Sequence, residues 1–249
     1  MDEVSPSPWL PSAEIHLPQE NRILAIDKPQ GWTSFDVVNK IRGALRRQLG
    51  RKQIKVGHSG TLDPMATGLL LLGTGKCTRE LAALQELGKE YEGSLRFGIS
   101  TPSYDTDTAV NGQYPWEHIT EAKIREALET FFFGEIWQVP PIYSAIKVGG
   151  QPLYKKARRG ETFEPPPRRV VIYNWEILRM ELPDMDFRIA CSKGTYIRSL
   201  AHDLGRHLGS GACLHRLVRT RIGAYSLTGA QTPQAFIQSL GIHPSNSGS

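Results

Sequence analysis

Cysteine is scarce in this sequence, and the three cysteines, Cys77, Cys191 and Cys213, never show C-x-x-C spacing. Such distant thiols fit neither a disulfide framework nor a zinc site. Long apolar runs are also missing, because the longest, residues 68–73, is far short of the roughly 20 residues that a membrane helix needs. The first twenty residues contain no basic segment followed by an apolar one, so no secretory signal is readable. We therefore expect a cytoplasmic protein without disulfides.

Acidic residues are absent from one long stretch of the chain. No acid occurs between Asp36 and Asp63, and the bases there are Lys40, Arg42, Arg46, Arg47, Arg51, Lys52 and Lys55. A second stretch, residues 147–169, is also rich in bases and interleaves them with tyrosine and glycine. One basic run is often only a solvated helix face. Two such runs in a chain of net charge +5 favour a nucleic acid as the partner.

The composition is otherwise that of a folded protein. Its 249 residues are 39% hydrophobic and 22% charged, which suffices for one large domain or two small ones. Residues 1–21 lack periodicity and predict a flexible tail. We expect the main domain at 22–230, and a short helix with a tail at 231–249. Residues 140–167, rich in proline, glycine and bases, predict a long functional loop.

Hydrophobic spacing predicts the main secondary-structure elements. Helical periodicity predicts helices beginning after Thr33 or Ser34, over residues 120–132 and over residues 199–208. Alternation and short apolar runs predict strands over residues 23–26, 89–98, 170–182 and 186–197. In the second helix we expect Ile124, Leu128 and Phe131 to face inward. Strands joined mostly by turns indicate an α+β fold with a mixed, mostly antiparallel central sheet flanked by helices.

The segment densest in chemistry is residues 57–69, GHSGTLDPMATGL. It is not a G-x-S-x-G nucleophile elbow, because Thr61 stands at the last glycine position, and residues 73–77 do not complete a P-loop. What remains is a lone carboxylate, Asp63, in a turn stiffened by Pro64. A metal site usually recruits more carboxylates, whereas a nucleophilic aspartate is already ionised at neutral pH. A purely structural role as a turn residue stays open at this point.

A second segment, residues 193–198 (KGTYIR), adds weight to a catalytic Asp63. We expect Tyr196 and Arg198 on one face of a strand end, just before a helix. A nearby guanidinium would keep an aspartate ionised in an apolar pocket.

Five segments, in this order, resemble the TruB family of tRNA pseudouridine-55 synthases. They are DKPQGWTS at 27–34, GHSGTLDPMATG at 57–68, KEY at 89–91, PIYSAIK at 141–147 and CSKGTYIR at 191–198. The resemblance implies a pseudouridine synthase catalytic domain over 22–230, with 140–167 as its RNA-binding insertion. Family members often carry a C-terminal PUA domain, and residues 231–249 are too few for one, so we expect the short form.

The resemblance also implies roles for individual residues. Asp63 would be the catalytic aspartate, Tyr91 would stack on the target base, and Arg198 would pair with Asp63. Positions that line or support the uridine pocket correspond to His58, Tyr196, Leu217 and Lys28. RNA-binding side chains are expected at Arg79, Lys147, Lys155, Lys156, Arg158 and Arg159. Alone, each of these residues has an ordinary structural explanation, and only their co-occurrence favours function.

The implied activity is a cofactor-free and metal-free isomerase acting on the T arm of tRNA. The enzyme breaks an N-glycosidic bond, turns the uracil and forms a C-glycosidic bond, which requires a flipped nucleotide. The residues do not decide whether Asp63 attacks C1′, adds to C6 or removes the 2′ proton. We expect a monomer with no obligate protein partner and no membrane contact. Two alternatives stay open: a non-catalytic tRNA-binding chaperone and a guide-RNA-dependent synthase of the dyskerin-like class.

Overall fold

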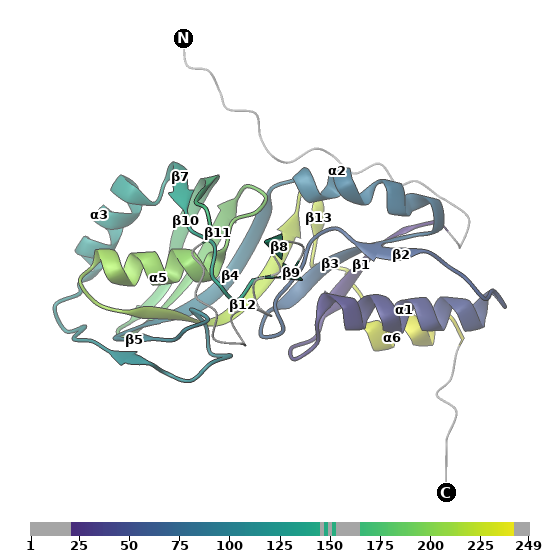
Figure 1. Cartoon of the computed structure of the whole chain (residues 1–249), viewed down its shortest axis with the longest axis horizontal. Helices are drawn as coiled ribbons and strands as arrows, with labels where there is room; N and C mark the ends of the chain where they lie inside the picture. The colour runs from purple at the N-terminus through teal and green to yellow at the C-terminus, as the bar shows by residue number, and fades with distance from the viewer. Residues whose placement is uncertain (1–20, 145–146, 149–150, 153–164, 242–249) are drawn as a thin grey trace, which may run out of the picture. The chain divides into compact units, whose positions relative to one another are not determined.

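The computed structural model describes residues 21–144, 147–148, 151–152 and 165–241 (Figure 1). The chain divides into two compact units, the first comprising Met1–Lys89 with Val218–Ser249 and the second Glu90–Leu217. Strand β12 (Ala212–Ile222) begins in the second unit and ends in the first. Across these described residues, the helices are too short or too polar to cross a membrane.

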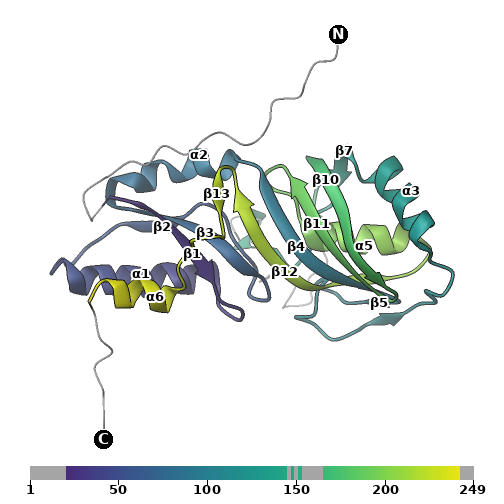
Figure 2. The same cartoon turned by 180° about the vertical axis from the view of Figure 1, so that it is seen from behind.

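The first unit is built on a sheet in which β3 lies between β1 and the end of β12. Its other elements are β1 (Ile23–Lys28), α1 (Ser34–Gln48), β2 (Val56–His58), β3 (Thr67–Thr74), η1 (Gly75–Arg79), α2 (Leu81–Glu86), β13 (Tyr225–Ser226) and α6 (Pro233–Ser239). Strands β1 and β2 pair antiparallel with β3, and β12 pairs parallel with it. Helices α1 and α6 lie side by side on one face of this sheet, and α2 lies on the other (Figures 1 and 2).

Strand β3 is buried on both faces, which explains its unbroken apolar sequence. Successive side chains of a strand point to opposite faces. Leu70 and Leu72 therefore join the core under α1, while Leu69 and Leu71 pack with Ile222 on the α2 side. The strand positions the loop before it, residues 59–66, at one end of the sheet.

Helix α1 begins as predicted, with Thr33 as its N-cap. The Thr33 hydroxyl accepts a hydrogen bond from the Asp36 N–H at 3.1 Å, and the Asp36 carboxylate accepts one from the Thr33 N–H at 2.8 Å. This reciprocal capping box satisfies donors that the first turn leaves unpaired. Its inner face is apolar at helical spacing, because Val37, Ile41 and Leu45 are buried.

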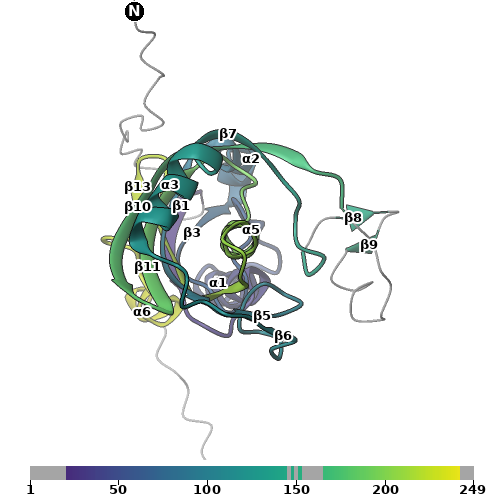
Figure 3. The same ribbon diagram turned by 90° about the vertical axis from the view of Figure 1, so that its left-hand side faces the viewer.

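The second unit contains a curved sheet in the order β12-β4-β11-β10-β7, and helix α5 lies inside the curve (Figure 3). Its elements are β4 (Lys89–Phe97), β5 (Ile99–Ser100), β6 (Gly112–Gln113), α3 (Glu121–Phe131), β7 (Gly134–Gln138), β10 (Arg168–Glu181), β11 (Asp184–Cys191) and α5 (Ile197–His207). β10 pairs antiparallel with β11 and with β7. The predicted mixed, mostly antiparallel α+β fold is confirmed.

Two details of the prediction are wrong. Phe131 is 54% exposed and its ring lies 4.2 Å from that of His207, whereas Phe132, just past the end of α3, is buried. Phe131 is the last residue of α3, and Phe132, the C-cap residue, takes the buried position in its place. The strand predicted to run to residue 197 ends at Cys191, because Gly194 adopts a φ of +76°, which breaks the extended backbone.

Residues 140–167, predicted as a loop, contain a short antiparallel hairpin of β8 (Lys147–Val148) and β9 (Gln151–Pro152). Residues 145–146, 149–150 and 153–164 lie outside the described part of the chain, as does most of the predicted N-terminal tail. The prediction that the three cysteines form no disulfide framework is confirmed, since Cys77, Cys191 and Cys213 are buried and none of them is disulfide-bonded.

Candidate active site

Asp63 lies in the first unit, in the loop between β2 and β3. Its side chain is half-buried, and its carbonyl oxygen accepts a hydrogen bond from the Ala66 N–H at 3.1 Å. That bond closes a tight turn over Pro64 and Met65. The loop therefore presents the carboxylate from a fixed backbone.

The start of α1 holds one side of this turn. The buried Ser34 hydroxyl accepts a hydrogen bond from the Leu62 N–H at 2.8 Å and donates one to the Leu62 carbonyl oxygen at 3.2 Å. The Gly31 N–H donates to the Pro64 carbonyl oxygen at 2.8 Å. Both neighbours of Asp63 are thus tied to the segment that leads into α1.

Lys28 strengthens the same connection from a completely buried position. Its ammonium group donates to the carbonyl oxygens of Pro29, Trp32 and Pro64 at 3.0, 2.6 and 3.4 Å. These contacts join the turn after β1 to the Asp63 loop. The structure gives Lys28 a supporting position, and direct contact with a substrate stays a prediction.

Arg219 on β12 holds the other side of the loop. It is only 1% exposed, and its guanidinium donates to the carbonyl oxygens of Leu69, Gly60 and Thr61 at 2.7, 3.2 and 3.4 Å. The planar fork of arginine suits this use because one group can reach several acceptors in fixed directions. Two buried cations, Lys28 and Arg219, therefore fasten the loop that carries Asp63.

Replacing Arg219 by methionine is expected to lower the free energy of unfolding by about 2–4 kcal/mol, because the buried Leu69 carbonyl and the partly buried Gly60 and Thr61 carbonyls lose their donor. Chemical denaturation measures this loss. The control is Arg216→Met on the same strand, where the side chain is exposed and the effect should stay below about 0.5 kcal/mol. Equal effects of the two substitutions would show that Arg219 does not hold the loop.

His58 lies at the end of β2, one residue before this loop. Its Nδ1 accepts a hydrogen bond from the Gly60 N–H at 3.3 Å, so the neutral ring carries its proton on Nε2. Burial lowers the pKa of His58, and the positive charge of Arg219 lowers it further. Both effects favour the neutral ring.

In the second unit, Arg198 occupies the first turn of α5 and is 3% exposed. Its Nε lies 3.4 Å from the Asp105 carboxylate, and its terminal nitrogens donate to the carbonyl oxygens of Ser103 and Tyr143, each at 2.9 Å. The prediction that Arg198 lies on a strand end with Tyr196 is wrong, because α5 begins at Ile197. The guanidinium is held in place by a buried carboxylate and two carbonyls.

The loop that carries Asp105 is itself fixed in an unusual conformation. Tyr104 has a φ of +64°, which costs free energy for a residue with a side chain. Its ring stacks on His202 of α5 at 3.9 Å between centroids, and its carbonyl oxygen accepts from the Leu214 N–H at 2.9 Å. The Ser103 hydroxyl donates to the Asp105 carboxylate at 2.5 Å. These contacts hold Asp105 against Arg198.

Asp203 of α5, next to His202 in the sequence, is partly buried, and burial disfavours the charged form of its carboxyl group. Burial raises its pKa to about 6, although Arg206 opposes the shift. A raised pKa in the folded state stabilises the fold below about pH 4 and loses that contribution as the pH rises through about 6. Asp203→Asn is therefore expected to raise the free energy of unfolding by about 2 kcal/mol at pH 8 and not at pH 4. Chemical denaturation at pH 4 and at pH 8 measures the two free energies of unfolding. The control is Glu129→Gln, an exposed position where the free energy of unfolding should change at neither pH. A gain for Asp203→Asn at pH 4 equal to that at pH 8 would contradict the prediction.

Tyr196 caps the start of α5 and is half-buried. The buried Gln138 side chain fixes its backbone, accepting from the Tyr196 N–H at 2.7 Å and donating to its carbonyl oxygen at 3.0 Å. The Arg168 guanidinium lies 5.2 Å from the centre of the Tyr196 ring. An aromatic face paired with a cation is a combination that nucleic-acid sites use.

The other predicted site residues fall in both units. Tyr91 on β4 is 9% exposed and shares the buried face of that strand with Leu95 and Phe97. Leu217 on β12 is buried, and Arg79 at the end of η1 is exposed. Lys147 belongs to β8, and four predicted RNA-binding residues lie outside the described part of the chain: Lys155, Lys156, Arg158 and Arg159.

The structure brings these residues together within each unit. In the first, His58 and Lys28 share a loop system with Asp63. In the second, Tyr91, Arg198 and Leu217 belong to one compact unit. The pairing of Asp63 with Arg198 joins residues of different units and stays a prediction. Among the residues that the structure describes, no group of three or more His, Cys, Asp or Glu side chains could hold a metal ion.

Sequence reasoning missed three residues that position the site: Arg219, Asp105 and Gln138. Arg219 is separated from its acceptors by 150 or more residues, and Asp105 lies 93 positions from Arg198. No local sequence pattern indicates contacts between residues so far apart in the chain. A buried glutamine such as Gln138, at the end of an otherwise ordinary strand, gives no signal either.

A family model and several known proteins are similar to this chain over most of its length. Residues 46–197 match the family model described as TruB family pseudouridylate synthase, N-terminal domain. The chain is 49% identical over 222 residues to a Flavobacterium johnsoniae protein named tRNA pseudouridine synthase B, covering 89% of this chain and 96% of that protein. It is 48% identical over 213 residues to a protein of the same name from Opitutus terrae, covering 86% of each.

Two solved structures are also similar to this chain. The chain superimposes with a TM-score of 0.61 and 33% identity on a chain of a Cbf5-Nop10-Gar1 complex, covering 84% of this chain. It also matches a chain of an H/ACA RNP bound to a substrate RNA containing 2′-deoxyuridine, with a TM-score of 0.62 and 28% identity over 90% of this chain. The present chain spans about half the length of those two chains, 50% and 56%.

Proposed function

The chain belongs to the TruB family of pseudouridylate synthases and is an isomerase; from this premise we propose that it converts the T-loop uridine of tRNA to pseudouridine with Asp63 as its catalytic group. The observation that carries the proposal is the anchoring of the Asp63 loop, where buried Lys28 and Arg219 fix the backbone on both sides of a half-buried carboxylate. Such a carboxylate, held in one position, is suited to act on a nucleoside.

The reaction needs the uridine outside the base stack, because the glycosidic bond is inaccessible in a folded T loop. Tyr91 would stack on the flipped base, and the neutral ring of His58 would occupy space that the base leaves. Tyr196 and Leu217 would line the uridine pocket. Aromatic stacking of a base is worth about 1–3 kcal/mol, which helps to offset the cost of unstacking.

Arg198 would face Asp63 in the assembled site and keep the carboxylate ionised. The support for this is that Arg198 is rigidly held by Asp105 and two carbonyls, so its charge has a fixed position. Asp63 could attack C1′, add to C6 or remove the 2′ proton, and all three routes need the same ionised oxygen.

We propose that the protein acts as a monomer without a guide RNA or an obligate protein partner. The relative in the Cbf5-Nop10-Gar1 complex is found with protein partners, which makes a guide-dependent synthase the alternative to test. Purified protein should convert uridine to pseudouridine in an unmodified tRNA transcript when no other macromolecule is present. Nucleoside analysis by mass spectrometry measures the product. Binding without conversion would indicate the chaperone, and conversion only with added guide RNA would indicate the guide-dependent enzyme.

A further inference from the structure

The outward side of α1 carries a basic surface that the proposed catalytic site does not use. Residues three or four apart lie on one face of a helix, and Lys40, Gly43, Arg46, Arg47 and Gly50 follow this spacing. The surface continues past the helix end to Arg51 and Lys52. We call the five exposed cations Lys40, Arg46, Arg47, Arg51 and Lys52 the α1 basic face.

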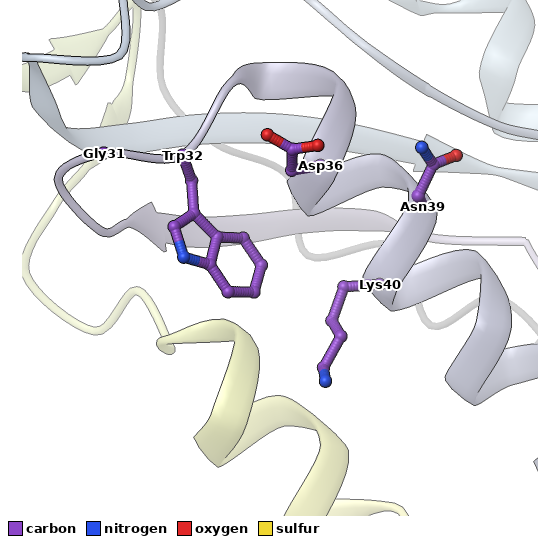
Figure 4. A pocket seen from close by; sticks show the side chains of 5 residues that line it. All are labelled: Gly31, Trp32, Asp36, Asn39 and Lys40. Atoms are coloured by element: carbon purple, nitrogen blue, oxygen red, sulfur yellow. The ribbon is translucent and has the colours of Figure 1, made fainter.

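Two shallow hollows lie along this surface. The first, of about 580 Å³, is lined by Gly31, Trp32, Asp36, Asn39 and Lys40 (Figure 4). The second, of about 440 Å³, is lined by Gly43, Arg46, Arg47, Gly50, Arg51 and Lys52. A Cβ added at Gly43 or Gly50 would meet nothing within 4 Å, so these glycines leave open space between the cationic side chains.

The first hollow joins one cation, Lys40, to the edge of the apolar core, because Trp32 packs against the core cluster that contains Val37 and Ile41. In Figure 4 the indole of Trp32 and the side chain of Lys40 extend to the same side of α1, toward α6. Farther round the helix, the exposed aromatic Phe35 has the Arg42 guanidinium 6.0 Å from the centre of its ring. Lys40 is therefore the group of the first hollow that can meet a phosphate, and the exposed Phe35 ring is an aromatic face near the start of the same helix.

The second hollow is cationic throughout and open to solvent. Arg46 and Arg47 lie in the last turn of α1, where they also complement the negative end of the helix. That local role does not explain Lys40, two turns earlier, or Lys52, beyond the helix end. Lys40 and Arg47 are about 10 Å apart along the helix axis, and Arg51 and Lys52 extend the row of cations past the helix end. Such a row matches a line of phosphates better than a single small anion.

The position of α1 relates this surface to catalysis. The helix begins at the hydrogen bonds between Ser34 and Leu62, beside Asp63, and runs away from that loop. An RNA strand that runs along the helix from the candidate active site would pass over the α1 basic face. We infer that the α1 basic face binds the phosphate backbone of the RNA substrate beyond the flipped nucleotide. This inference rests on the proposed function.

The test replaces two cations of the second hollow in the full chain, as Arg46→Gln with Arg47→Gln. Glutamine keeps the helix propensity and removes the charge. Affinity for an unmodified tRNA transcript is measured at several salt concentrations by fluorescence anisotropy. Each lost phosphate contact lowers the slope of log affinity against log salt by about 0.7–0.9, so the slope should fall by about 1.5, with at least about tenfold weaker binding at low salt.

Two further variants isolate the cause. Lys123→Gln with Arg125→Gln removes the same charge from the exposed helix α3 and should leave the slope unchanged. Arg46→Lys with Arg47→Lys keeps both charges and should restore the wild-type slope, because lysine binds a phosphate as a point charge. A wild-type slope in the glutamine variant overturns the inference. The inference is also overturned if the lysine variant binds tRNA as weakly as the glutamine variant. The two guanidinium groups would then be needed for the structure of the protein and not for their charge.

Failure of the inference and failure of the proposed function are distinguishable in these experiments. The wild-type protein is assayed in parallel for conversion of uridine in the same transcript. Active wild-type protein with an unaffected glutamine variant rejects only the α1 basic face. Inactive wild-type protein that binds tRNA through the α1 basic face rejects the proposed reaction and leaves the inference standing.

Discussion

Asp63→Asn is expected to lower the single-turnover rate of isomerisation by at least about 10⁴-fold, while the affinity for tRNA stays within about threefold. Asparagine has nearly the shape of aspartate but is neither a nucleophile nor a base at neutral pH. The loss is therefore expected for each of the three possible routes. A labelled tRNA transcript mixed with excess enzyme gives the rate, and filter binding gives the affinity.

The interpretation depends on an intact loop. The bonds that fix the Asp63 loop use the backbone of Gly60, Thr61, Leu62 and Pro64, which the substitution leaves in place. Glu80→Gln, an exposed carboxylate of the same unit, provides a matched loss of charge that should change neither quantity. If the Asp63 variant kept more than a tenth of the wild-type rate, a direct catalytic role for the carboxylate would be excluded.

The second large effect is expected at Asp105. Asp105→Asn should lower the free energy of unfolding by about 3–5 kcal/mol, because it leaves the buried Arg198 charge without its carboxylate partner. It should also lower the rate of isomerisation, since the guanidinium would no longer be held in one place. Denaturation and single-turnover kinetics measure the two losses separately.

A double-mutant cycle distinguishes the ion pair from a general packing defect. Arg198→Gln removes the charge that Asp105 balances, so the double variant should lose less stability than the sum of the two single variants. Asp107→Asn, two residues away and exposed, should cost less than about 1 kcal/mol. Additive losses in the cycle would contradict the pairing that the structure shows.

Much of the fold was predictable where local chemistry decides it. Helix α1 combines a capping residue, Thr33, with apolar residues on one face, and the two signals agree. Strand β4 alternates buried and less buried residues along its length. The hairpin of β10 and β11 follows from two extended segments separated by Pro183. In each case the sequence within about fifteen residues carries the information.

Prediction failed where distant segments decide the structure. β3 has no alternation because both of its faces are covered, and periodicity cannot separate such a run from a buried helix. β12 was not predicted, since its C-terminal part mixes arginines with apolar residues. One of those arginines, Arg219, is buried only because the carbonyls of the Asp63 loop surround it.

In the candidate site, too, local sequence identified some residues, and others became visible only in the fold. The GHSGTLDP segment identified Asp63, and the resemblance to a family gave roles to Tyr91 and Arg198. The residues that position these groups could not be found in this way, because Asp105 and Gln138 act through partners far away in the sequence. Polar residues that serve as buried supports look like ordinary loop or strand residues until the fold brings their partners close.

Nucleotide-resolution mapping of pseudouridine in a full tRNA transcript, after incubation with the purified protein alone, tests the central claim most directly. We predict one modified position, the T-loop uridine, with wild-type protein, and none with Asp63→Asn. Pseudouridine at other positions instead of that one, or the same T-loop modification by the Asp63 variant, would contradict the account.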